Sequence, residues 1–243
     1  MMMMPFGSDP AYLILMVGGM ALTFLPQWFV KSTYESHLQI QSRYGQTGAQ
    51  VATDILRRNG INDVTVEMSD GFLSDHYDPS AKAVRLSPDN FSGSSIAGIA
   101  VAAHEVGHAL QHAKGYYPVV LRSALVPVVN LGSNLGPLLL MVSLGLGFTS
   151  QVMPDWAWYL AWVGVALFGT AVLFHMVTLP VEFNASARAL AILENGTYVT
   201  REELPGAKKV LFAAAMTYVA AALYSLIQLM YYVFRLLGAR RDD

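Results

Sequence analysis

The apolar residues of this 243-residue chain gather in long runs, and one stretch of mixed polarity separates the first run from the others. A helix needs about 20 mostly apolar residues to cross a bilayer. Four runs are of about that length, at residues 11–30, 124–148, 156–179 and 210–234. Residues 31–95 have the balance of charged and apolar side chains that is typical of a globular segment. The pattern predicts a mainly α membrane protein with about four transmembrane helices and one small α+β domain.

Composition narrows the class further. Apolar residues make up 54% of the chain and charged residues 13%, an imbalance that is atypical of a soluble domain. We therefore expect a multi-pass protein in contact with a lipid bilayer. The net charge of −2 gives no reason to expect a nucleic-acid partner, and the lack of cysteine excludes disulfides and thiolate metal sites. The oligomeric state stays open.

The mixed-polarity stretch contains signals for short elements. Helical spacing of apolar residues over 50–56, followed by Gly60, predicts a helix that ends at this glycine. Alternating polarity predicts strands at 64–68 and 83–87, with a turn at 75–79 between them. We expect a small sheet beside the next helix. Residues 84–87 are either an edge strand that pairs with an extended substrate or a strand that only covers the helix.

Residues 92–115 predict a single helix, with serines at its start and a glycine at its end. This helix carries the pentapeptide HEVGH at residues 104–108. Residues four apart lie on one helix face, so His104 and His108 can bind one zinc ion together. Glu105 is offset by one residue and can instead take a proton from a water on the metal. The alternative interpretation is two surface histidines beside a solvated glutamate.

A catalytic zinc site of this kind needs a third protein ligand and an open position for water. The metzincin pattern would place a histidine six residues after the second one, but Lys114 stands there. His112 lies one turn too far along a straight helix to share the ion. We predict that Glu182 is the third ligand, because the third apolar run returns the chain to the side of the two histidines. Pro180 is expected to end or kink that run, and the alternative is a solvated glutamate at a helix start.

Residues 104–111, taken with the blocks at 75–79, 84–87 and 180–190, resemble the YugP-like bacterial membrane zinc metallopeptidases. The resemblance implies peptide hydrolysis, Zn²⁺ as the cofactor and a protein or peptide as the substrate. It also implies a location in the bacterial inner membrane.

The predicted domain organisation follows the same blocks. Residues 1–30 form an N-terminal transmembrane helix, and residues 31–116 form a zincin-like soluble domain with the HExxH helix. Residues 117–243 form a membrane domain with three further transmembrane helices, and residues 181–194 form the helix that supplies the third ligand.

A more distant similarity concerns the surroundings of the third ligand. The sequence from Glu182 to Ala185 is similar to the third-ligand motif of the HtpX and CAAX prenyl protease class, which is of the gluzincin type. That class has an aspartate where this chain has Ser186. The carboxylate that would orient a zinc-binding histidine is therefore missing, and Asn184 and Asp78 are the candidates to replace it as a hydrogen-bond partner.

The predicted function is a membrane-embedded, zinc-dependent metalloendopeptidase. In this hypothesis His104, His108 and Glu182 bind Zn²⁺, and Glu105 is the general base. Four residues are candidates to stabilise the oxyanion, and the sequence leaves the choice among them open: His76, Tyr77, His175 and Arg188. Two other functions stay open as well: a membrane scaffold or chaperone-like protein with a structural zinc site, and a zinc hydrolase that acts on a non-peptide substrate.

The membrane orientation depends on basic residues at the ends of the apolar runs. Lys31, Lys208 and Lys209 fall on the side of the predicted catalytic domain, which favours a cytoplasmic location for it. Arg240 and Arg241 at the opposite end argue against this orientation.

Overall fold

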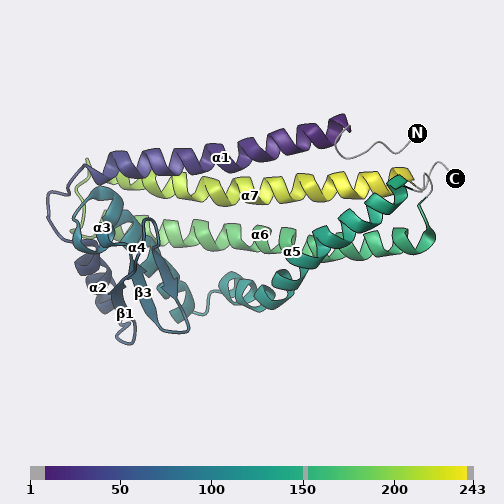
Figure 1. Ribbon diagram of the computed structural model, residues 1–243. Coiled ribbons are helices and arrows are strands. Elements are labelled where there is room, and N and C mark those ends of the chain that lie inside the picture. Colours follow the sequence, from purple (N-terminus) through teal and green to yellow (C-terminus); the bar gives the residue numbers. More distant parts are fainter. Residues whose placement is uncertain (1–8, 150–152, 240–243) are drawn as a thin grey trace. The chain divides into compact units, whose positions relative to one another are not determined.

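The structure is a computed structural model that describes residues 9–149 and 153–239 (Figure 1). Helices dominate the described chain, and the strands occur together between residues 65 and 86. The helices are α1 (Pro10–Leu38), α2 (Gly48–Arg58), α3 (Pro88–Ser92), α4 (Ile96–Ala113), α5 (Tyr117–Thr149), α6 (Asp155–Asn195) and α7 (Leu204–Ala239). The strands are β1 (Thr65–Met68), β2 (His76–Asp78) and β3 (Ala83–Leu86).

Four of the described helices, α1, α5, α6 and α7, are long and apolar enough to cross a membrane. Together with the small three-stranded sheet, they confirm the predicted fold class. Each of them extends beyond the predicted apolar run; α1, for example, continues past residue 30 to Leu38.

The expectation that Pro180 could end the third run is wrong, because α6 continues through this proline to Asn195. A proline inside a helix removes one backbone hydrogen bond. Packing of the following turns offsets this loss, since Val181, Ala185 and Ala189 on α6 are fully buried. Glu182 therefore lies inside a long helix and not at the start of a new one.

The chain forms two compact units. The described residues of the first lie within 9–25, 121–149, 153–179 and 218–239, and the second comprises residues 26–120 and 180–217. In the first unit, small residues let helices approach closely: a Cβ atom on Gly136 of α5 would lie 2.8 Å from the backbone nitrogen of Phe168 on α6. Arg240 and Arg241 lie outside the described residues. The predicted domain boundaries near residues 30 and 116 stay predictions.

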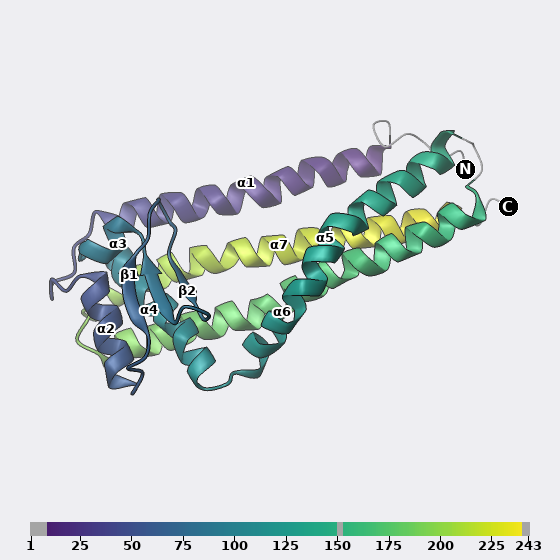
Figure 2. The ribbon, with the colours of Figure 1, turned by 60° about the horizontal axis from the view of Figure 1, so that its bottom comes forward.

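The sheet of the second unit has the order β1-β3-β2, with β1 parallel and β2 antiparallel to β3 (Figure 2). Of the two interpretations of residues 84–87, the edge strand is therefore wrong, because β3 is the central strand and is paired on both sides. Its burial explains the position: Val84 and Leu86 are fully buried. Residues 76–78, which were expected in a turn, form β2, one of the two edge strands, instead.

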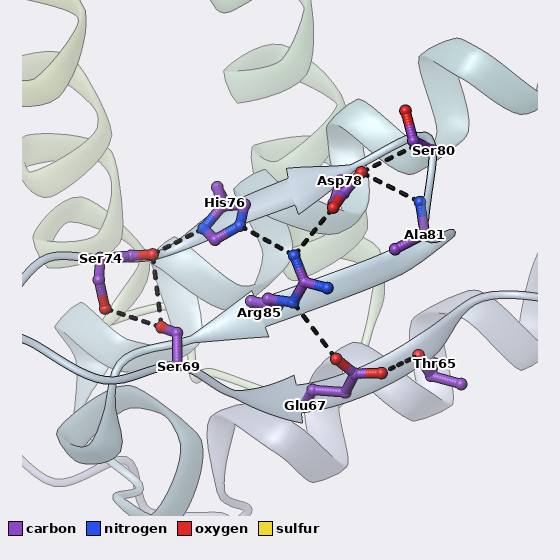
Figure 3. A network of polar contacts seen from close by, with 9 residues as sticks. All are labelled: Thr65, Glu67, Ser69, Ser74, His76, Asp78, Ser80, Ala81 and Arg85. Atoms are coloured by element: carbon purple, nitrogen blue, oxygen red, sulfur yellow. Dashed lines mark hydrogen bonds and ion pairs between the residues drawn. The ribbon is translucent and has the colours of Figure 1, made fainter.

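The side chains on one face of the sheet form a polar network around Arg85 (Figure 3). Arg85 on the central strand donates to Asp78 on β2 at 2.9 Å and to Glu67 on β1 at 3.3 Å. The ring of His76 lies on the same face, with its Nε2 atom 3.5 Å from Arg85 Nη1. Since successive side chains of a strand point to opposite faces, Tyr77 lies on the other face, toward α4.

Helix α4 is at the centre of the second unit. Its N-cap is Ser95, whose hydroxyl accepts a hydrogen bond from the backbone N–H of Gly98 at 3.0 Å. Gly115 follows its end with φ +59°, a conformation that favours glycine. Apolar side chains of α2, the sheet, α6 and α7 surround α4; the fully buried ones include Val51, Ile55, Val84, Leu86, Ala189, Leu193 and Ala207.

Candidate metal centre

His104 and His108 present their rings side by side on one face of α4, with ring centroids 4.7 Å apart. Glu182 of α6 lies opposite them. Its Oε2 atom is 3.3 Å from His104 Nε2 and 3.5 Å from His108 Nε2. One ligand atom from each of the three side chains lies within 4.8 Å of the other two. The structure thus brings the three predicted ligands together in one cluster.

The two helices can approach this closely because Gly107 has no side chain. A Cβ atom at Gly107 would lie 2.7 Å from the carbonyl oxygen of Ala185 on α6. Ala185 is fully buried at this contact. Since Glu182 precedes Ala185 by three residues on the same helix face, the contact places its carboxylate beside the two imidazoles.

Each imidazole also contacts a polar side chain through its other nitrogen. His104 Nδ1 lies 3.1 Å from the hydroxyl of Ser186, and His108 Nδ1 lies 3.0 Å from Oε1 of Gln111. Such partners orient metal-binding histidines and leave Nε2 directed at the ion. Ser186 therefore takes the place of the aspartate that the distant class has at this position.

The two replacements suggested by the sequence do not contact the histidines directly. Asp78 pairs with Arg85 on the far face of the sheet, and Asn184 accepts a hydrogen bond from Gln111 at 3.1 Å. The sequence reasoning missed Gln111. Its position three residues after His108, on the same helix face, is the signal that could have identified it.

Glu105 is buried on α4 next to both histidines. Burial raises the pKa of its carboxyl above the ordinary value, against the attraction of the two imidazoles. For His108, burial alone would lower the pKa. The Glu182 carboxylate, which accepts from the charged imidazole, and the charges of Glu105 and Glu182 outweigh burial and raise the pKa of His108. The centre thus places two carboxyl groups, those of Glu105 and Glu182, beside the two imidazoles, an arrangement that suits a bound cation.

His112 and the four oxyanion candidates are not part of the three-residue cluster. His112 is outside it, with its ring 5.4 Å from that of Tyr77. His76 lies on the sheet face that carries Arg85, away from α4. Arg188 donates from Nε to Asn184 at 2.7 Å, and His175 belongs to the other compact unit. Within the compact unit that contains the centre, Tyr77 and Arg188 are thus the oxyanion candidates that do not lie on the Arg85 face of the sheet.

Comparison with known proteins identifies the family of this chain. A family profile described as "Putative neutral zinc metallopeptidase" matches residues 12–237. The chain belongs to this family. It is also 44% identical over 232 residues to a protein of Bacillus subtilis (strain 168) named "Putative membrane protease YugP", covering 96% of this chain and 99% of that protein. No solved structure matches the chain. The resemblance to YugP-like membrane zinc metallopeptidases is therefore confirmed.

The residues of the centre fit the zinc ion that the family implies. Two imidazole nitrogens and one carboxylate oxygen are ligands that zinc prefers, and three protein ligands are the number found in catalytic sites, where a fourth position stays open. Both imidazoles already have partners at Nδ1. Zn²⁺ is the cofactor of this family, and the chain is a membrane protein with four apolar helices among its described residues.

Proposed function

We propose that this chain is a membrane-embedded zinc metalloendopeptidase with His104, His108 and Glu182 as the metal ligands and Glu105 as the general base. The observation that carries the proposal is the convergence of three ligand atoms within 4.8 Å, with a buried carboxylate on the same helix as the two imidazoles. Family membership supports peptidase activity, and the zinc-ligand pattern supports a hydrolytic mechanism.

The chain's own groups divide the chemistry among them. Bound zinc lowers the pKa of a water toward about 7 and polarises the carbonyl of the scissile bond. The Glu105 carboxylate takes the proton of the attacking water and later delivers it to the nitrogen of the leaving amine. Tyr77, through its hydroxyl, and Arg188, through its guanidinium, are the candidates to donate a hydrogen bond to the oxyanion.

We propose that an extended segment of a protein substrate pairs with the edge strand β2. Among the described residues, β2 is hydrogen-bonded to β3 on one side and to no further strand on the other. Its residue Tyr77 packs against His112, one turn after His108 on α4. A peptide added along this edge runs past the metal centre and gains main-chain hydrogen bonds that do not depend on its sequence.

The proposed location is the bacterial inner membrane, with the second compact unit in the cytoplasm. Lys31, Lys208 and Lys209 are exposed and belong to this unit, and basic residues favour the cytoplasmic side. The chain has no cysteine, so a single introduced cysteine is its one thiol and reports on which side of the membrane that residue lies. A cysteine at Ser80 is expected to resist a membrane-impermeant maleimide in intact cells; labelling there refutes the orientation.

The test of activity is cleavage of an unfolded protein, such as casein, by the purified full chain in detergent. We expect cleavage that a chelator stops and added zinc restores. Glu105→Gln is the matched control, because it keeps all three ligands: it should bind zinc like the wild type and cleave nothing. Zinc binding without cleavage by the wild type would favour a scaffold or a hydrolase of non-peptide substrates, and full activity of the Gln variant would remove Glu105 from the mechanism.

A further inference from the structure

Gln111 is a fully buried amide on α4 that contacts both helices of the metal centre. Its Oε1 atom lies 3.0 Å from His108 Nδ1. Its Nε2 atom donates to the backbone oxygen of Val181 at 2.7 Å and to Asn184 Oδ1 at 3.1 Å. Val181 directly precedes Glu182 on α6, so one side chain touches a histidine ligand and the residue next to the carboxylate ligand.

The guanidinium of Arg188 and the backbone carbonyl of Val181 determine which atoms donate and which accept in the hydrogen bonds of Asn184 and Gln111. A guanidinium can only donate, so the Arg188 Nε–H, 2.7 Å from Asn184, requires the oxygen of that amide to face it. A backbone carbonyl can only accept, so Val181 requires the NH₂ group of Gln111. The reversed amide would bring Oε1 of Gln111 against two acceptor oxygens, which leaves this buried oxygen without a donor. Oε1 of Gln111 therefore faces His108.

This orientation determines the state of the imidazole. Oε1 has no hydrogen to donate, and it lies nearer to Nδ1 (3.0 Å) than the Glu182 carboxylate lies to Nε2 (3.5 Å). Neutral His108 therefore carries its proton on Nδ1 and keeps a lone pair on Nε2. Nε2 is the atom that lies 3.5 Å from the Glu182 carboxylate, where the ion is expected. The contact at His104 is different, since the hydroxyl of Ser186 can either donate or accept.

We infer that Gln111 is a positioning residue with two effects. It holds His108 in the tautomer whose Nε2 can bind a metal ion, and its hydrogen bonds join α4 to α6 beside Glu182. The inference rests on the proposed roles of His108 and Glu182 as zinc ligands. Ser186 does not restrict His104 in this way, so the two histidines differ. The tautomer of His108 is set before the metal binds, whereas His104 can adopt either tautomer.

The first test measures zinc affinity of the full chain in detergent, by competition with a chromogenic chelator. Gln111→Met keeps the volume and removes all three hydrogen bonds, and we expect the affinity to fall by about 10- to 100-fold. Ser186→Ala is the comparison at the other histidine, with an expected loss below about tenfold. Tyr34→Phe removes a buried hydrogen bond to Asn90 in the same unit and should leave zinc affinity unchanged.

An affinity of Gln111→Met equal to that of the wild type would overturn the inference. The same holds if Tyr34→Phe lowers the affinity as much, because the loss would then reflect the fold alone. Neither readout uses a peptide. A chain that binds zinc as expected but cleaves no protein would thus contradict the proposed activity and leave the role of Gln111 standing.

The second test takes its readout from the wild type. Long-range proton–nitrogen NMR of the histidine-labelled, zinc-free wild type at alkaline pH reports which ring nitrogen carries the proton. We expect the Nδ1–H tautomer alone for His108, whose signals are identified by their loss in His108→Gln. The Nε2–H tautomer, or a mixture of both, at His108 would overturn the inference.

Discussion

The contact between Gly107 on α4 and Ala185 on α6 gives the sharpest test of how the centre is assembled. Replacing Gly107 by alanine places a methyl group 2.7 Å from the carbonyl oxygen of Ala185 and 3.2 Å from its Cα and carbonyl carbons. Ordinary contacts of a Cβ atom begin near 3.4 Å, so the helices must separate by about 0.7 Å at this point. The atoms in the way are backbone, which cannot turn aside as a side chain can.

Both stability and metal binding should suffer. Overpacking in a close-packed interior costs about 1–3 kcal/mol of unfolding free energy. The same displacement draws Glu182, one helical turn before Ala185, away from the imidazoles that it approaches to 3.3 and 3.5 Å. Because a misplacement of about 1 Å can cost about 100-fold in rate, we expect protein cleavage to fall by one to two orders of magnitude.

The assay compares thermal unfolding, zinc affinity and casein cleavage of Gly107→Ala with those of the wild type. Gly169→Ala is the matched control, because it adds the same methyl group to α6 at a position with nothing within 4 Å. It should be neutral or slightly stabilising, since alanine favours a helix over glycine. If Gly107→Ala melts, binds zinc and cleaves like this control, the close contact does not position the ligands and the reasoning fails.

Three further predictions concern single side chains. Glu182→Gln should lower zinc affinity more than about tenfold while the chain still folds, as measured by metal analysis after dialysis; full zinc content would show that another residue is the ligand. His112→Ala should keep one zinc per chain, because its ring packs on Tyr77 outside the cluster, and loss of the metal would place it among the ligands. Tyr198→Phe should make the zinc-free chain unfold at a higher pH on acidification. The Tyr198 hydrogen bond, followed by those of neighbouring arginines, lowers the pKa of Asp54 against the effect of burial.

The higher unfolding pH of Tyr198→Phe follows from the linkage between proton binding and folding. A carboxyl whose pKa is lowered by folding adds stability above its unfolded pKa, and that stability is lost as the pH falls through the folded pKa. Without the hydroxyl, the pKa of Asp54 returns toward its ordinary value, so the loss begins at a higher pH. The hydrogen bond itself contributes about 1 kcal/mol at neutral pH. Identical acid-unfolding curves for the two proteins would refute this role of Tyr198.

The sequence was informative where spacing alone decides the geometry. Residues four apart on a helix share a face whatever surrounds them, so His104 and His108 could be paired with no knowledge of the fold. The direction of each apolar run across the bilayer then indicated that Glu182 returns to the same side. The length of the runs was enough to predict the class of the fold.

Features that depend on tertiary packing could not be found in this way. The pairing of β3 with strands on both sides depends on contacts between residues distant in sequence. With three residues, β2 is too short to show an alternation of polar and apolar side chains. Pro180 marks a local break, yet buried neighbours hold α6 together through it. The spacing of Gln111 from His108 could indicate their contact, but its hydrogen bonds to Val181 and Asn184 on α6 depend on tertiary packing.

X-ray absorption at the zinc edge of the purified full chain tests the central claim most directly. The account predicts one zinc per chain, with nitrogen and oxygen neighbours at about 2.0–2.2 Å and outer-shell scattering from two imidazoles. In Glu182→Gln, whatever zinc is retained should keep the imidazole scattering and lose a carboxylate oxygen. A wild-type spectrum with one imidazole, or with three, would contradict the assignment of His104, His108 and Glu182 as the ligands.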